Sequence, residues 1–128
     1  MTVKLGVIEN IISSLNFNEQ GLIPAIAQNS ETGEVLMLAY MNADAIRETL
    51  ENGHVCYWSR SRKTLWRKGE ISGNEQHLVE FSYDCDKDTL LLKVSQIGPA
   101  CHTLRRHCFF YALRDGQITE MLEPESAD

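Results

Sequence analysis

The chain has 128 residues, 43% of them hydrophobic, so it is long enough for one domain with a buried core. No apolar run approaches the roughly 20 residues that a membrane-spanning helix needs. The N-terminus lacks the basic and apolar regions of a signal peptide, so a cytoplasmic location is expected. The net charge of −6 argues against general affinity for nucleic acid or an anionic membrane.

The first half of the chain predicts a helix, two strands and a second helix, in that order. Apolar side chains recur at helical spacing over residues 4–15, which indicates an amphipathic helix. Residues 22–41 are typical of two strands around a turn at residues 32–33. Asn42 is suited to cap the second helix, which we expect to end at Gly53.

The second half is rich in predicted strands, which are expected at residues 55–61, 77–84, 89–97 and 109–114. Residues 62–76 form a polar connection punctuated by glycine, and loops of this length are usually functional. The last strand reaches a turn at residues 115–116, and the acidic tail from about residue 120 is expected to fray. The pattern predicts an α+β fold, mainly antiparallel β with two or so helices, in one domain over residues 1–128.

The pentapeptide DCDKD places carboxylates at alternate positions between two of these strands. Alternate residues share a face of an extended segment, so Asp84, Asp86 and Asp88 lie close together and repel one another. Such oxygen ligands suit Mg²⁺ or a similar cation, and an exposed acidic turn is the alternative. An EF-hand is excluded because Thr89 stands where that loop needs glycine and Ser95 where it needs the closing glutamate.

Cysteines supply a second set of possible metal ligands, since disulfides are rare in the cytoplasm. Cys85 alternates with the aspartates and therefore points the other way in an extended backbone. Cys101 and Cys108 do not have the Cys-x-x-Cys spacing of a zinc knuckle. Three thiolates would still occupy three corners of a Zn²⁺ tetrahedron and leave the fourth to water. Buried, unreactive cysteines are the alternative, and we assign Cys56 to the core.

Basic residues are concentrated in one segment. Five of the twelve lysines and arginines occur among nine consecutive positions: Arg60, Arg62, Lys63, Arg67 and Lys68. In an acidic protein such a cluster suits a small anionic ligand better than a polyanion, and a solvated basic loop is the alternative.

Four long motifs in this order resemble the phosphoribosyl-AMP cyclohydrolase family of histidine biosynthesis. They are GLIPAIAQNSETGEVLMLAYMN, YWSRSRKTLWRKGEISGNEQ, DCDKDTLLLKVSQIGPACHT and RRHCFF. The likeness runs from about Gly21 to Tyr111. It implies the stand-alone form of the enzyme, because no second domain of the fused form follows in this chain.

The resemblance implies two metal sites and an intertwined homodimer with those sites at the subunit interface. The zinc ligands of the family fall on Cys85, Cys101 and Cys108, the first from one subunit and the other two from its partner. The Mg²⁺ ligands fall on the three aspartates of DCDKD. On this reading the pentapeptide alternates ligands for two metals on its two faces.

The implied reaction opens the adenine ring of 1-(5-phosphoribosyl)-AMP at the N1–C6 bond, by attack of zinc-bound hydroxide on C6. Zinc deaminases attack adenine C6 from a similar three-ligand site. His102 is the candidate proton shuttle, although a structural histidine is the alternative. The expected substrate-binding residues are Arg60, Arg62 and Lys68 for the phosphates, Trp66 for the base, and Ser72, Gly73, Thr103 and Arg105. Trp66 could equally belong to the core.

Three positions depart from the family motifs: a glycine is Leu104, a serine is His107, and a threonine or serine is Ile71. Leucine disfavours the left-handed backbone that glycine adopts, so a strained or rearranged loop is expected. His107 could crowd the zinc, become its fourth ligand or point to solvent, and a fourth protein ligand would make the site structural.

Two other functions compete with the cyclohydrolase reading. A metal-stabilised, nucleotide-binding dimer with impaired catalysis is favoured by these departures. A zinc nucleoside or base deaminase is weakened because neither H-x-E nor P-C-x-x-C occurs in the sequence.

Overall fold

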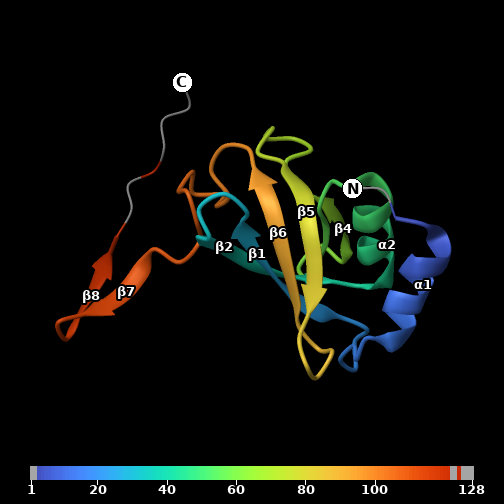
Figure 1. Ribbon diagram of the computed structural model, residues 1–128. Coiled ribbons are helices and arrows are strands. Elements are labelled where there is room, and N and C mark those ends of the chain that lie inside the picture. Colours follow the sequence, from blue (N-terminus) through green and yellow to red (C-terminus); the bar gives the residue numbers. More distant parts are fainter. Residues whose placement is uncertain (1–2, 122–123, 125–128) are drawn as a thin grey trace.

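The computed structural model describes residues 3–121 and residue 124, and Figure 1 shows a twisted sheet with two helices and a separate hairpin. The helices are α1 (Leu5–Ser14) and α2 (Ala43–Asn52). The strands of the sheet are β1 (Ile23–Asn29), β2 (Val35–Met41), β3 (Cys56–Ser59), β4 (Thr64–Arg67), β5 (Gln76–Tyr83) and β6 (Leu90–Gln96). Their order is β4-β3-β2-β1-β6-β5, and β7 (Tyr111–Arg114) pairs only with β8 (Gln117–Glu120) among the described residues. The α+β class expected from the sequence is confirmed.

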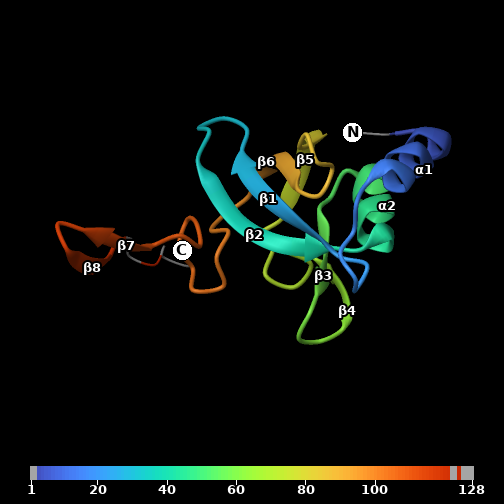
Figure 2. The same cartoon turned by 90° about the horizontal axis from the view of Figure 1, so that it is seen from below.

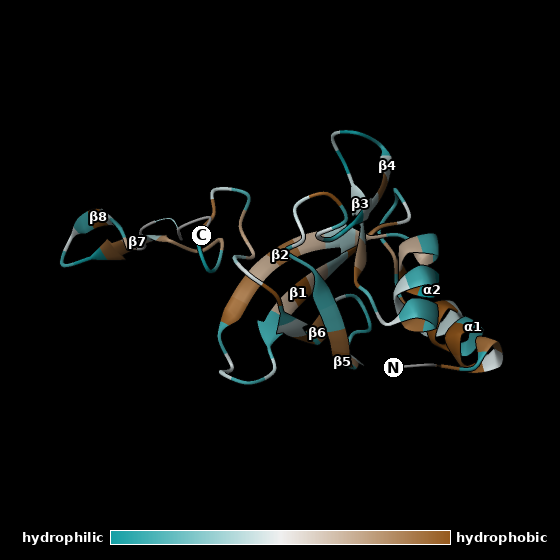
Figure 3. Cartoon of the chain, turned by 90° about the horizontal axis from the view of Figure 1, so that it is seen from above, coloured by the Kyte–Doolittle hydropathy of each residue, from teal (hydrophilic) through white to brown (hydrophobic). Residues whose placement is uncertain are grey.

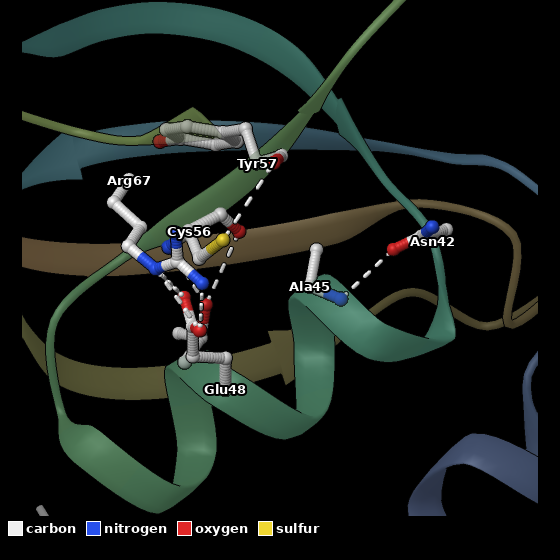
Figure 4. Close-up of polar contacts among 7 residues, drawn as sticks. Asn42, Ala45, Glu48, Cys56, Tyr57 and Arg67 are labelled. Carbon is white, nitrogen blue, oxygen red and sulfur yellow. Dashed lines mark hydrogen bonds and ion pairs between the residues drawn. The ribbon is translucent and has the colours of Figure 1, made fainter. Parts of the chain in front are cut away.

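The two helices form where their capping and apolar residues predict them. Asn42 accepts a hydrogen bond from the backbone nitrogen of Ala45 at 2.8 Å, which caps α2 (Figure 4). Gly53 ends α2 in the left-handed conformation, at φ 77°. The Arg47 guanidinium of α2 binds both carboxylate oxygens of Glu9 in α1 at 2.8 Å, which joins the helices. None of the helices in the described part of the chain is long and apolar enough to span a bilayer.

The centre of the sheet is β1, which pairs antiparallel with β2 and parallel with β6. Side chains at alternate positions of β1 and β6 are buried, as the period of a strand requires: Ile23, Ala25, Ala27, Leu90, Leu92 and Val94. The parallel pairing was not foreseen, because the β1–β6 contact joins segments more than 60 residues apart in the chain. Figures 1 and 2 place both helices at one end of the sheet.

One strand was missed in the sequence analysis. The connection expected over residues 62–76 contains β4, which pairs antiparallel with β3 at the edge of the sheet. Only Leu65 and Trp66 are apolar in that strand, so its sequence lacks the alternation that identifies a strand. Its pairing with β3 places Trp66 opposite Tyr57, and the rings lie 5.5 Å apart.

The β7–β8 hairpin projects away from the sheet, at the end opposite the helices (Figures 1 and 2). The turn at Asp115 and Gly116 forms as predicted, with both residues at positive φ. Figure 3 shows the hydrophobic colour of β7 although the hairpin stands apart from the core. Glu120 still belongs to β8, whereas most of the tail that was expected to fray lies outside the described residues.

Candidate active site

Two cysteines lie together in the loop between β6 and β7. Cys101 is 4% exposed, and its Sγ accepts a hydrogen bond from Thr103 Oγ1 at 3.0 Å. The Cys101 and Cys108 thiols lie close enough for each to shift the pKa of the other. The backbone nitrogen of Cys108 donates to Leu36 O at 2.7 Å, which anchors the loop to β2. The structure thus brings together two of the three predicted zinc ligands.

The surroundings of the two thiols give them different acidities. Burial opposes ionisation of Cys101, but hydrogen bonds from Thr103 and Cys108 and the Arg105 charge lower its pKa below the usual value. Burial raises the pKa of Cys108 to about 11, and the neighbouring Cys101 adds to this rise. Burial also lowers the pKa of Lys68, against the attraction of both thiolates. One thiol of the pair is therefore prepared to ionise before the other.

The loop that carries the pair has a left-handed residue where the family motif has glycine. Leu104 lies at φ 68°, in the left-handed region, and its nitrogen donates to Cys101 O at 2.9 Å. Two more backbone bonds close the loop, from Cys101 N to Arg105 O and from Ala100 N to Arg106 O. The loop is therefore strained at Leu104, because these bonds hold leucine in a conformation that it disfavours.

His107, the second departure, is turned towards Glu34. Its Nδ1 accepts a hydrogen bond from Phe109 N at 3.1 Å, and its Nε2 lies 3.8 Å from Glu34 Oε2. Its side chain is only 12% exposed, so it does not simply point to solvent. Arg106 binds the same carboxylate through two hydrogen bonds of 2.8 and 3.0 Å. With both ring nitrogens directed elsewhere, this conformation does not offer His107 as a fourth zinc ligand.

A pocket of about 380 Å³ opens beside Cys101. Of the predicted site residues, Arg62, Trp66, Lys68, Ser72 and His102 line it, together with Ile71 and Leu104. Lys68 Nζ donates to Ala100 O at 2.7 Å and lies 5.4 Å from the centre of the Trp66 ring. The pocket therefore combines a thiol, an exposed imidazole, an aromatic face and positive charge.

A second hollow of about 610 Å³ lies along β3 and the β3–β4 turn. It shares Arg62 and Trp66 with the first pocket and is also lined by Arg60. The Arg60 guanidinium lies 4.1 Å from the centre of the Tyr40 ring, so the ring holds it in place. The half-buried Trp66 ring lines both basic hollows and packs against the core, and its stacking on the base stays a prediction.

The remaining predicted substrate residues are not brought into the first pocket. Among the described residues, Gly73 and Arg105 are absent from its lining. Arg105 forms an ion pair with Glu120 and lies 4.0 Å from the centre of the Phe110 ring. Thr103 directs its hydroxyl to the Cys101 thiol, a role that its position two residues after the cysteine could have suggested.

The DCDKD segment forms the exposed turn between β5 and β6. Asp88 N donates to Asp84 Oδ1 at 3.1 Å, and Lys87 lies at φ 60°. Slight burial opposes ionisation of Asp84, but hydrogen bonds from Asp88 and Thr89 lower its pKa below the usual value. Asn16, which follows α1, holds the turn through hydrogen bonds to the carbonyls of residues 86 and 87, at 2.8 and 2.7 Å. The turn is fixed in place while its carboxylates remain exposed.

Cys85 lies in this turn, far from the cysteine pair. Strand β6 leads from the turn to the loop that carries Cys101, so the two sites lie at opposite ends of that strand (Figure 1). Seven residues of extended chain span roughly 20 Å. A single chain therefore cannot close a three-cysteine zinc site in this conformation.

Buried polar side chains support the pocket from beneath, and the sequence analysis did not identify them. The Tyr57 hydroxyl donates to Gln76 Oε1 at 2.6 Å, and Gln76 Nε2 donates to Gln96 Oε1 at 2.9 Å. Both Tyr57 and Gln76 are fully buried. These residues fix the start of β5 relative to β3. Periodicity alone could not separate them from apolar core residues.

Arg67 of the basic cluster has a structural partner. It binds both oxygens of Glu48 at 2.7–3.0 Å, as Figure 4 shows beside Cys56. Cys56 is buried, as predicted, and burial together with the nearby Glu48 carboxylate raises its pKa to about 12. Cys56 is thus an inert core thiol.

Comparison with known proteins identifies the family. The family model described as phosphoribosyl-AMP cyclohydrolase matches residues 37–110. A protein of that name from Dinoroseobacter shibae is 60% identical over 112 residues, which cover 88% of this chain and 94% of the relative. Another from Rhodospirillum centenum is 56% identical over 119 residues, which cover 93% of this chain and 90% of the relative. The basic pocket beside the cysteine pair, the DCDKD turn and these likenesses lead to one conclusion: the chain belongs to the phosphoribosyl-AMP cyclohydrolase family.

Proposed function

We propose that this chain is a zinc-dependent hydrolase that opens the adenine ring of 1-(5-phosphoribosyl)-AMP at the N1–C6 bond. The observation that carries the proposal is the position of the cysteine pair at the edge of a basic pocket that also presents His102 and Trp66. The relatives named for this enzyme support the substrate and its place in histidine biosynthesis.

The thiol pair fits zinc by its chemistry. Sulfur ligands suit Zn²⁺, and the low pKa of Cys101 favours the thiolate that binds metal. Zinc held there would lower the pKa of a bound water towards ~7 and so supply hydroxide at neutral pH. Thr103 serves this site as a positioning residue, because its hydroxyl orients the Cys101 sulfur.

The third thiolate comes from a second copy of the chain. Cys85 is exposed and lies beyond the opposite end of β6, so it is available to a partner and out of reach of its own cysteine pair. The projecting hairpin supports a dimer, since Tyr111, Leu113 and Ile118 are 66–82% exposed. Large apolar side chains exposed together are typical of an interaction surface. We propose that the hairpin packs against the partner subunit.

The substrate binds across the two hollows that share Arg62 and Trp66. Its two phosphate groups need two cationic positions, which Arg60 and Arg62 supply in one hollow and Lys68 in the other. Trp66 offers the face on which the base stacks. Ser72 also lines the pocket, and its Oγ accepts a hydrogen bond from Asn74 N at 3.1 Å.

His102 moves the proton. It follows a zinc thiolate directly in the chain, is exposed, and lines the pocket in which the ring would lie. An imidazole there can accept a proton from water and deliver it to ring nitrogen N1 as the N1–C6 bond breaks. The aspartates of the DCDKD turn supply oxygen ligands for Mg²⁺ at the subunit interface, and their exposure leaves them open to a cation.

Complementation between inactive variants tests the shared site. Cys85→Ser and Cys101→Ser should each abolish ring opening, followed by the ultraviolet change of the purine with zinc present. Mixing the two under conditions that exchange subunits should restore about a quarter of the wild-type activity, because half of the dimers are mixed and each has one intact site. Failure to recover any activity in verified mixed dimers would refute a site shared between subunits.

A binding dimer without catalysis is the second candidate, and the strained backbone at Leu104 favours it. Full zinc occupancy with no ring opening would support that candidate. Release of ammonia would instead identify a deaminase.

A further inference from the structure

Three metal-ligating side chains gather away from the cysteine pair, where α2, β3 and β5 meet. His54 follows the end of α2 and pairs with His77 of β5 in an isolated antiparallel bridge. Glu75 lies two residues before His77, so their side chains share a face of the extended segment. One ligand atom from each lies within 4.8 Å of the others, and among the described residues this is the one such group of three.

The backbone fixes the positions of these side chains. Val55 N donates to Gln76 O at 2.9 Å, and Leu78 N donates to Gly53 O at 2.7 Å. The side chain of Gln76, between Glu75 and His77 in the chain, is buried and anchored to Tyr57. The segments that carry the three ligands are therefore joined through backbone bonds on both sides.

The distances suit a small cation. His54 Nδ1 lies 3.4 Å from Glu75 Oε2, and the imidazole rings of His54 and His77 have centroids 4.4 Å apart. Around a tetrahedral Zn²⁺ with bonds of about 2.1 Å, ligand atoms stand about 3.4 Å from one another. The separations reach at most 4.8 Å, and the His54 side chain is largely exposed, so it has room to turn towards a bound ion.

The donor set selects the class of metal. Two imidazole nitrogens and one carboxylate are ligands of zinc and of related transition metals, whereas Mg²⁺ and Ca²⁺ prefer oxygen alone. We propose that His54, Glu75 and His77 form a binding site for a divalent transition-metal ion such as Zn²⁺, separate from the cysteine pair. This inference does not depend on the proposed function.

The site has an open side and shares lining residues with the active pocket. His54 and Glu75 line a cavity of about 280 Å³, which leaves room for water in the remaining coordination positions. Lys68 and Glu70 line both this cavity and the pocket beside the cysteine pair. Glu75 ends the loop of residues 69–75, so metal bound there would hold the loop that lines the pocket.

Zinc titration of the full-length protein tests the proposal. The protein is stripped of metal and then placed in saturating Mg²⁺, which occupies the oxygen sites. One equivalent of Zn²⁺ is added for the thiols, and the binding of further Zn²⁺ is measured by calorimetry. We expect His54→Gln and His77→Gln to weaken the second binding event by roughly 100-fold. Glu70→Gln is the matched control: Glu70 lines the same cavity without belonging to the group of three, and its change should leave the affinity unaltered.

Imidazole nitrogen resonances of the unaltered chain give a readout that does not depend on the variants folding. The second equivalent of Zn²⁺ should shift the signals of His54 and His77, and circular dichroism without metal should show both variants folded. The proposal is overturned if those signals stay in place. It is equally overturned if folded His54→Gln binds the second equivalent as tightly as the wild type, or if wild-type binding is no tighter than about 1 mM.

Discussion

The left-handed backbone at Leu104 leads to a prediction about two small replacements. Leu104→Gly and Leu104→Ala both remove the side chain beyond Cβ, so they differ only in Cβ and in backbone freedom. A non-glycine residue in the left-handed region costs about 1–2 kcal/mol. Glycine loses about 0.5–1 kcal/mol more than alanine in chain entropy on folding. We therefore expect Leu104→Gly to have a free energy of unfolding about 1 kcal/mol above that of Leu104→Ala.

Leu38 in β2 provides the matched control. It is 46% exposed, close to the 42% of Leu104, but it is not among the described residues with positive φ. At Leu38 the order should reverse, and the alanine variant should be more stable by about 0.5–1 kcal/mol. Urea unfolding of the four metal-free variants at one pH measures both differences. If Leu104→Ala equals or exceeds Leu104→Gly, the loop does not hold the strain inferred from its φ angle.

Three further outcomes can be checked. Thr103→Val should raise the pKa of Cys101, because it removes the hydroxyl that donates to the thiol. Alkylation of Cys101 by iodoacetamide, measured by mass spectrometry over a range of pH, should then shift to higher pH. An unchanged profile would show that the Thr103 hydroxyl does not lower the pKa of Cys101. Gly69→Ala should lower the free energy of unfolding in urea by about 2–4 kcal/mol, because its Cβ would lie 2.4 Å from a backbone nitrogen. Gly73→Ala has a similar φ but open space around the Cβ, and should lower it by about 1–2 kcal/mol. Equal losses would contradict the steric clash at Gly69. Tyr57→Phe should lower the free energy of unfolding by about 1–3 kcal/mol, because it leaves the buried Gln76 amide oxygen without its donor. A loss below about 0.5 kcal/mol would show that water replaces the hydroxyl.

Local patterns in the sequence were sufficient for most of the elements. The period of apolar residues identified α1, and Asn42 and Gly53 marked the ends of α2, because capping and left-handed termination act within a few residues. Apolar strand-like segments identified the strands on either side of DCDKD, and the Asp115-Gly116 pair identified the turn between β7 and β8. The family motifs singled out the cysteines and aspartates as ligands, which remains a prediction until metal is measured.

Contacts between distant segments decided the rest. Strand β4 exists because it pairs with β3, although Leu65 and Trp66 alone give it no periodic signal. The family resemblance already grouped Cys101 with Cys108 and assigned Cys85 to the partner subunit. Only the structure places the first two thiols together, with Cys85 beyond the far end of β6 and Leu104 in a left-handed backbone. Side-chain chemistry and local backbone preference are properties of a few neighbouring residues. The meeting of thiols, rings and charges in one pocket depends on strand pairing across the whole chain, which only the tertiary structure fixes.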